Sequence, residues 1–201
     1  MHAVLTGDIV DSSALTGAEL NATLDAIRDT LSDMTAWTGP TGFARRAGDA
    51  WQSVLTDPRH SLRAALLIRA SLRRLDGDRT TRIAMAIGEG ALPDSALSNP
   101  NEAHGTAFTA SGRLLDTLSD PIHMAHASGG AQDATWILAD RIAAGWTQAQ
   151  ARALCEMLAP DPGPRSAAAS RLGISRQAVD QALHAAGFPA LEAALTALET
   201  E

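Results

Sequence analysis

The sequence contains no lysine and no tyrosine, and its only cysteine is Cys155. The absence of lysine excludes catalysis by a lysine, whether as a Schiff base or as a general base. A single cysteine excludes an internal disulfide framework and fits a reducing compartment. The N-terminus has no charged-then-apolar leader and no run of about 18 apolar residues occurs, so we expect a cytoplasmic protein with no membrane contact.

The net charge and the length of the chain further limit which kinds of protein it can be. The formal net charge is −7, and all sixteen basic residues are arginine. A negative chain argues against indiscriminate nucleic-acid binding, because such binding depends on neutralising phosphates. With 201 residues, of which 45% are hydrophobic, the chain suits one packed domain plus a small appendage.

Two Gly-Asp units occur where the chain is expected to turn or to end a strand. Gly7-Asp8 ends an apolar strand over residues 3–10, and Gly48-Asp49 lies at the turn of a hairpin that runs through about residue 55. Taken singly, each aspartate also fits a strand end or a turn former. Carboxylates on neighbouring strands can share a divalent cation, so we expect Asp8 and Asp49 to bind Mg²⁺ or Mn²⁺ together.

The hydrophobic pattern predicts an α+β fold for residues 1–128. Strand and helix periodicities alternate in the order β-α-β-β-α-β-α-β, with a loop at 93–104 and a helix at 105–118. Thr16 and Glu19 form a capping box that should begin the first helix. This order is typical of a ferredoxin-like antiparallel sheet with helices on one face.

After Gly129-Gly130 the pattern becomes all helical. Residues 129–146 are expected to form a connecting helix, and a second capping box at Thr147 and Gln150 should open an all-α domain over 147–201. Within it, residues 166–184 match a helix-turn-helix. Gly173 would make the turn, Ser175 would cap the second helix, and Ile174 and Val179 would pack between the helices.

The second helix of this motif carries side chains that suit base edges. These residues and a neighbouring phosphate-contacting arginine are Ser175, Arg176, Gln177, Gln181, His184 and Arg171. The alternative is a protein-docking hairpin. It is favoured by Asp180 on the same face and by the charge of residues 147–201, where four arginines and six acidic residues give −2. We expect DNA binding, because a dimer shares its phosphate contacts across two half-sites.

Four short blocks resemble the class III nucleotide cyclase homology domain. They occur in the family's order within residues 1–128 and comprise Gly7–Ser13, Gly48–Gln52, Arg82–Gly90 and Gly105–Arg113. With the C-terminal helices included, the chain resembles the SatD-like family of bacterial proteins over nearly all of its length.

The resemblance implies roles for individual residues. Asp8 and Asp49 match two metal-binding aspartates, whose ions would hold a triphosphate and lower the pKa of its 3′-hydroxyl. Arg113 matches the arginine that stabilises charge on the phosphates. Thr109 stands where the family has an asparagine that orients the ribose, and threonine has no amide donors, so we expect weak catalysis.

The resemblance also implies a nucleotide-binding role for Ile9, Arg45 and Glu102. Arg45 lies where adenylate cyclases have lysine, and Glu102 lies where they have aspartate. Because of these departures, the resemblance does not identify which base the nucleotide carries.

Together these features predict a homodimeric DNA-binding regulator. Its cyclase-like domain would bind a nucleoside triphosphate or a cyclic nucleotide, with weak or absent catalysis. The first alternative is an active nucleotide cyclase whose C-terminal helices serve assembly. The second is a purely structural interaction protein.

Overall fold

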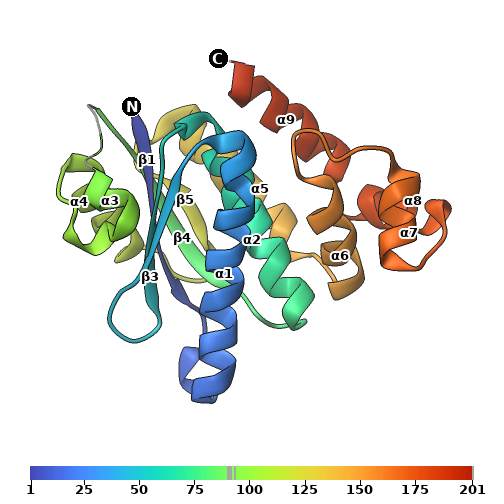
Figure 1. Ribbon diagram of the computed structural model, residues 1–201, viewed down its shortest axis with the longest axis horizontal. Helices are drawn as coiled ribbons and strands as arrows, with labels where there is room; N and C mark the ends of the chain where they lie inside the picture. The colour runs from blue at the N-terminus through green and yellow to red at the C-terminus, as the bar shows by residue number, and fades with distance from the viewer. Residues whose placement is uncertain (90–91, 93, 201) are drawn as a thin grey trace.

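The computed structural model describes residues 1–200 except 90–91 and 93, so Gly90 of the third sequence block lies outside the described residues. The fold is α+β, as expected, with a five-stranded mixed sheet in the order β2-β3-β1-β4-β5 (Figure 1). The strands are β1 His2–Ile9, β2 Thr41–Arg45, β3 Ala50–Leu55, β4 Thr81–Gly88 and β5 Met124–His126.

The expected antiparallel sheet is wrong at one edge, because β5 runs parallel to β4. The other neighbouring strands are antiparallel. The chain leaves β4 and returns through helix α4 before it enters β5, and such a helical crossover brings the next strand back in the same direction.

The helices separate into those around the sheet and those that follow it. The helices as far as β5 are η1 Ser12–Ala14, α1 Gly17–Thr38, η2 Pro58–His60, α2 Ser61–Leu75, α3 Asp94–Ser98, η3 Pro100–Glu102 and α4 Thr106–Leu115. After β5 come α5 Gly130–Ala144, α6 Gln148–Met157, α7 Arg165–Leu172, α8 Arg176–Ala185 and α9 Phe188–Thr200. The segment expected as a loop at 93–104 therefore contains α3 and η3.

Helices cover both faces of the sheet, so the expectation of helices on one face is wrong. Residues Ala3, Leu5 and Ile9 of β1 join the main core together with α1 and α2. The alternate residue Val4 packs instead with Ala107 of α4. Figure 1 shows α4 on the side of the sheet opposite α1 and α2. Val54 and Ala86 also belong to this second cluster, so apolar side chains pack on both faces of the sheet.

Both expected capping boxes are confirmed. The Thr16 side chain accepts from the Glu19 backbone, and the Glu19 carboxylate accepts from the Thr16 backbone in return. Thr147 and Gln150 make the same reciprocal pair at the start of α6. Each box satisfies two backbone donors that the first helical turn leaves free.

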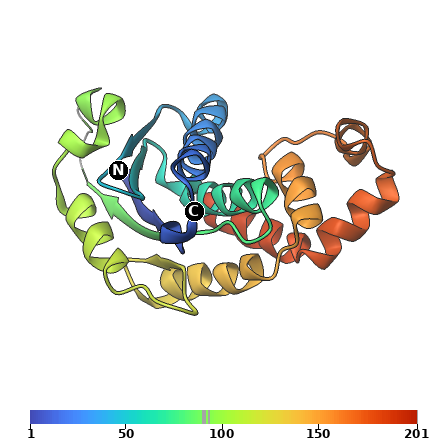
Figure 2. The same cartoon turned by 90° about the horizontal axis from the view of Figure 1, so that it is seen from below.

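The C-terminal helices pack against the rest of the chain. Helix α6 lies along α2, and Leu154, Val179 and Leu183 belong to the same hydrophobic core as Leu5 of β1. Figure 2 shows α6, α7 and α8 at one end of the molecule, and α9 runs back from that end to the middle, where the C-terminus lies. In the part of the chain that is described, no helix is both long enough and apolar enough to cross a membrane.

Candidate functional site

A cavity of about 750 Å³ lies on the α4 side of the sheet. The β2–β3 hairpin contributes Arg45 and Arg46, the segment before α4 contributes His104, and α4 contributes Thr109. The volume is in the range of small-molecule sites, and more than half of the lining residues are polar or charged.

The structure brings two of the predicted nucleotide residues, Arg45 and Thr109, into this cavity. Arg113 lies one turn further along α4, where it is exposed and outside the cavity lining as described. Glu102 is exposed on η3, and its carboxylate accepts a hydrogen bond from Asn99 Nδ2 at 2.8 Å. Its neighbour Asn101 lines the cavity instead.

The Arg45 guanidinium is held by the fold. Its Nε donates to Gly48 O at 2.8 Å, and its Nη1 donates to Asn21 Oδ1 at 2.9 Å. The Arg45 backbone oxygen accepts from Asn101 Nδ2 at 2.8 Å. The hairpin turn, α1 and η3 therefore fix the side of the cavity where Arg45 and the exposed Arg46 place positive charge.

A row of buried polar side chains lines the inner end of the cavity, and sequence reasoning missed it. Gln52 and Thr6 are cross-strand neighbours on β3 and β1, and both contribute to the cavity wall. They are 5% and 1% exposed, and Ser111 of α4 behind them is fully buried. A threonine and a glutamine inside otherwise apolar strands were the signal in the sequence, but only the strand register shows that they meet.

A second cavity of about 400 Å³ lies at the end of β1. The predicted residues Ile9 and Asp49 line it together with Ser12, Arg82 and His123. Asp49 accepts a short hydrogen bond from the Ser12 hydroxyl. Asp8 pairs with Ala50 in the β1–β3 ladder, so the two aspartates lie at the same end of the sheet.

The Asp8 carboxylate is engaged by a guanidinium. Arg82 Nε donates to Asp8 Oδ1 at 2.8 Å, and Arg82 Nη2 donates to Asp8 Oδ2 at 2.6 Å. The third nitrogen, Nη1, donates to Leu118 O at 2.8 Å. This bidentate arrangement is the strong form of an arginine–carboxylate pair.

As placed, the donor set does not fit a divalent cation, because both oxygens of Asp8 already face a positive group. Among the described residues, no group of three or more His, Cys, Asp or Glu could hold a metal ion. Binding of Mg²⁺ or Mn²⁺ at Asp8 and Asp49 therefore stays a prediction.

Helices α7 and α8 are joined by a short turn in which Gly173 has a φ of 66°. The Ser175 hydroxyl caps α8 by accepting from Ala178 N at 3.1 Å. Val179 and Leu183 of α8 are buried. The expectation that Ile174 packs between the helices is wrong, since its side chain is 45% exposed.

The outer face of α8 carries the residues proposed to contact DNA. All five are exposed, namely Ser175, Arg176, Gln177, Gln181 and His184. Asp180 is bound by Arg165 at 2.7 Å and lies 3.7 Å from Arg176. Arg171, expected to contact phosphate, pairs with Glu156 of α6.

No protein-family model matches this chain, and a search of the curated proteins returns no match.

Proposed function

We propose that this chain is a homodimeric DNA-binding regulator whose α/β part binds a nucleotide. The single observation that carries the proposal is the division of α8 into two faces. Val179 and Leu183 are buried, while the opposite face presents an exposed arginine, two glutamines and a histidine. Arginine and glutamine have the donors and acceptors that match guanine and adenine edges.

The arrangement of α7 and α8 supports a helix-turn-helix. The left-handed Gly173 turns the chain, Ser175 caps the second helix, and Arg176 and Gln177 are exposed in its N-terminal half. That half of a recognition helix enters the major groove in such motifs. A two-fold dimer would offer two copies of Arg176 and Gln177 to half-sites related by the same symmetry.

The cavity near α4 supports the nucleotide. Arg45 and Arg46 bring two positive charges to its mouth, where phosphates can be held. The order β2-β3-β1-β4 also supports a ferredoxin-like, cyclase-like arrangement of the α/β part. Under this proposal, a bound nucleoside triphosphate or cyclic nucleotide changes DNA affinity.

We propose that catalysis is weak or absent. Thr109 has a hydroxyl where the family has an amide, and the Asp8 carboxylate is paired with Arg82. The alternative of an active cyclase is tested by incubation with each nucleoside triphosphate and Mn²⁺, followed by mass detection of a cyclic product. Robust turnover by the wild-type chain would replace our proposal with that alternative.

The DNA arm is tested by selection from random duplexes, with and without nucleotide, and a salt titration on the enriched sequence. Arg176→Ala should weaken binding by about 1–3 kcal/mol per half-site and relax the sequence preference. The matched control is Arg152→Ala, which removes an exposed arginine from α6 and should leave the preference unchanged. If no sequence is enriched at low salt, the DNA-binding proposal fails and protein docking by α8 takes its place.

A further inference from the structure

The buried row at the inner end of the α4-side cavity forms one connected hydrogen-bond chain. Gln52 Nε2 donates to Thr6 Oγ1 at 3.1 Å, and Thr6 Oγ1 lies 2.8 Å from Ser111 Oγ. Ser111 Oγ donates to Phe108 O at 3.3 Å. These side chains come from β3, β1 and α4, so the fold itself brings them together.

Each hydroxyl group has only one proton to donate, and this fixes which group is the donor in each of these hydrogen bonds. Phe108 O is a carbonyl oxygen and can only accept, so the single hydroxyl proton of Ser111 is donated to it. Thr6 must then donate its own proton to Ser111, and the remaining Thr6 contact must come from an N–H of Gln52. The Gln52 carboxamide is therefore oriented with its nitrogen toward Thr6 and its carbonyl oxygen away from it.

In the part of the chain that the structure describes, no group donates a hydrogen bond to Gln52 Oε1. Yet the side chain is only 5% exposed and belongs to the cavity wall. The small exposed part of this side chain therefore faces the cavity, where a ligand that donates a hydrogen bond can pair with the carbonyl oxygen.

We propose that Gln52 Oε1 accepts a hydrogen bond from the exocyclic amino group of the base of a bound nucleotide. This inference rests on the proposed nucleotide function and names how the base is recognised. An amino group projects beyond the ring edge, so it can reach an acceptor on the wall of the cavity. Arg45 and Arg46 at the mouth hold the phosphates, while Thr6 is a positioning residue that orients Gln52.

Calorimetry on the full chain tests the proposal with three pairs of 5′-triphosphates that differ only in this amino group. The pairs are ATP with purine riboside triphosphate, GTP with ITP, and CTP with the triphosphate of pyrimidin-2-one riboside. For the base that the cavity accepts, the amino form should bind about tenfold more tightly than its partner. Gln52→Met should bring the ratio toward one by weakening only the amino form.

Two further variants separate base recognition from a loss of folding. Thr6→Val keeps the shape of the side chain but removes the hydroxyl that orients Gln52, so it should also lower the ratio. Thr6→Ser keeps the hydroxyl and should retain the ratio. Gln132→Met, a glutamine of α5 outside this cavity, is the matched control and should change neither ratio nor affinity.

The failures of the two proposals are distinguishable. If none of these six triphosphates binds, and neither UTP nor a cyclic nucleotide binds, the nucleotide function falls and the inference falls with it. Binding of UTP alone overturns only the inference. If a triphosphate binds but its des-amino partner binds equally well, the nucleotide function stands and the inference is overturned. The inference is also overturned if Gln52→Met folds, as thermal melting reports, and keeps the wild-type ratio.

Discussion

The neighbours of a single carboxylate decide what it can bind. Asp8 lies where the resemblance expects a metal ligand, but a guanidinium occupies both of its oxygens. Asp49 lies at the same end of the sheet and accepts only the Ser12 hydroxyl among the described residues. Arg82 therefore keeps the Asp8 carboxylate from joining Asp49 in binding a cation.

Arg82→Ala should create or strengthen a cation site, because it frees the Asp8 carboxylate beside Asp49. Electron paramagnetic resonance of added Mn²⁺ measures the bound fraction directly. We expect clear binding by the variant and much weaker binding by the wild-type chain. The double variant Asp8→Asn/Arg82→Ala is the control and should bind no better than wild type. Equal Mn²⁺ binding by all three chains would show that these aspartates are not metal ligands.

His126 should make stability depend on pH. The side chain is 4% exposed, and its Nδ1 accepts from Ser128 N at 3.1 Å, which requires an unprotonated nitrogen. Burial lowers the pKa of His126 below its ordinary value of 6.5. The unfolded chain therefore binds more protons than the folded chain below that pH, so stability is present above about pH 6.5 and is lost as the pH falls.

Urea denaturation between pH 5 and 7.5 checks this dependence against His126→Gln. The variant is expected to be less stable at pH 7.5, but its stability should fall less steeply toward pH 5. The exposed histidine at position 104 supplies the control, and His104→Gln should keep the wild-type slope. Parallel slopes for wild type and His126→Gln would contradict the role of His126.

At the scale of helices and strands, local features were predictable and long-range ones were not. The capping boxes at Thr16 and Thr147 depend on residues three apart, so the sequence alone predicted the starts of α1 and α6. The parallel direction of β5 and the position of α4 on the second face depend on pairing between distant segments. For the same reason the contact between Thr6 and Gln52, far apart in the sequence, was missed.

The turn before α8 tests how far one glycine sets the geometry of that pair of helices. Gly173 has a φ of 66°, and an added Cβ would meet nothing within 4 Å, so substitution strains only the backbone. Gly173→Ala should cost about 1–2 kcal/mol of stability, and Gly173→Asn should cost less, since asparagine tolerates the left-handed region. Chemical denaturation measures both.

Gly112 of α4 is the matched control for that turn. It lies within a helix, and an added Cβ there also meets nothing within 4 Å. Gly112→Ala should therefore stabilise the protein by about 0.5–1 kcal/mol. If Gly173→Ala and Gly112→Ala shift the midpoint in the same direction, the conformational account of the turn is wrong.

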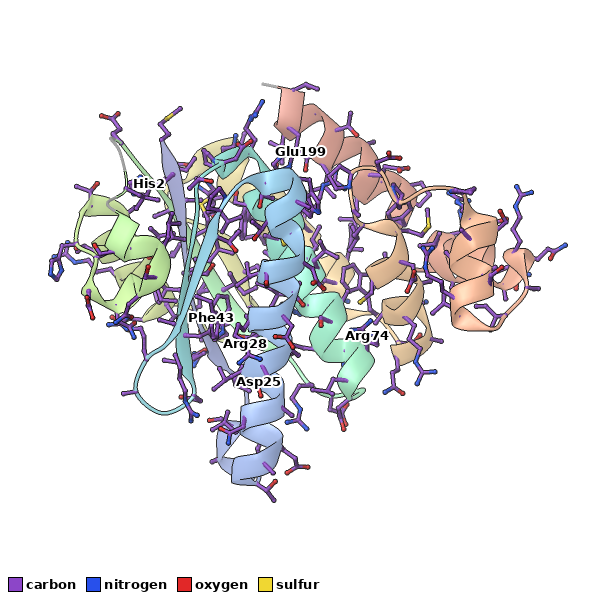
Figure 3. All side chains as sticks on the ribbon, in the orientation of Figure 1. His2, Asp25, Arg28, Phe43, Arg74 and Glu199 are labelled. Atoms are coloured by element: carbon purple, nitrogen blue, oxygen red, sulfur yellow. The ribbon has the colours of Figure 1, made fainter. Side chains whose placement is uncertain are left out.

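Across the whole molecule, one core connects the sheet to the last helix. Leu191 and Leu195 of α9 belong to the same cluster of buried residues as Leu66 of α2. An ion pair reinforces this connection: Arg63 Nε and Nη2 donate to the two oxygens of Glu199 at 2.6 and 2.7 Å. Arg63 Nη1 also donates to Leu158 O at 2.6 Å, at the end of α6. Figure 3 labels Glu199 on α9.

Because α9 packs in the same core as the sheet, removing its ion pair should destabilise the sheet as well as the C-terminal helices. Glu199→Ala leaves the Arg63 guanidinium, which is 5% exposed, without its carboxylate, and such a loss costs on the order of 3 kcal/mol. Glu192→Ala removes an exposed carboxylate from the same helix and should change stability little.

Hydrogen exchange resolved by peptide then compares β1 with α9 in each variant. We expect both segments to lose protection together in Glu199→Ala, because they share one core. Loss confined to α6–α9, with β1 as protected as in wild type, would mean that the C-terminal helices unfold as a separate unit.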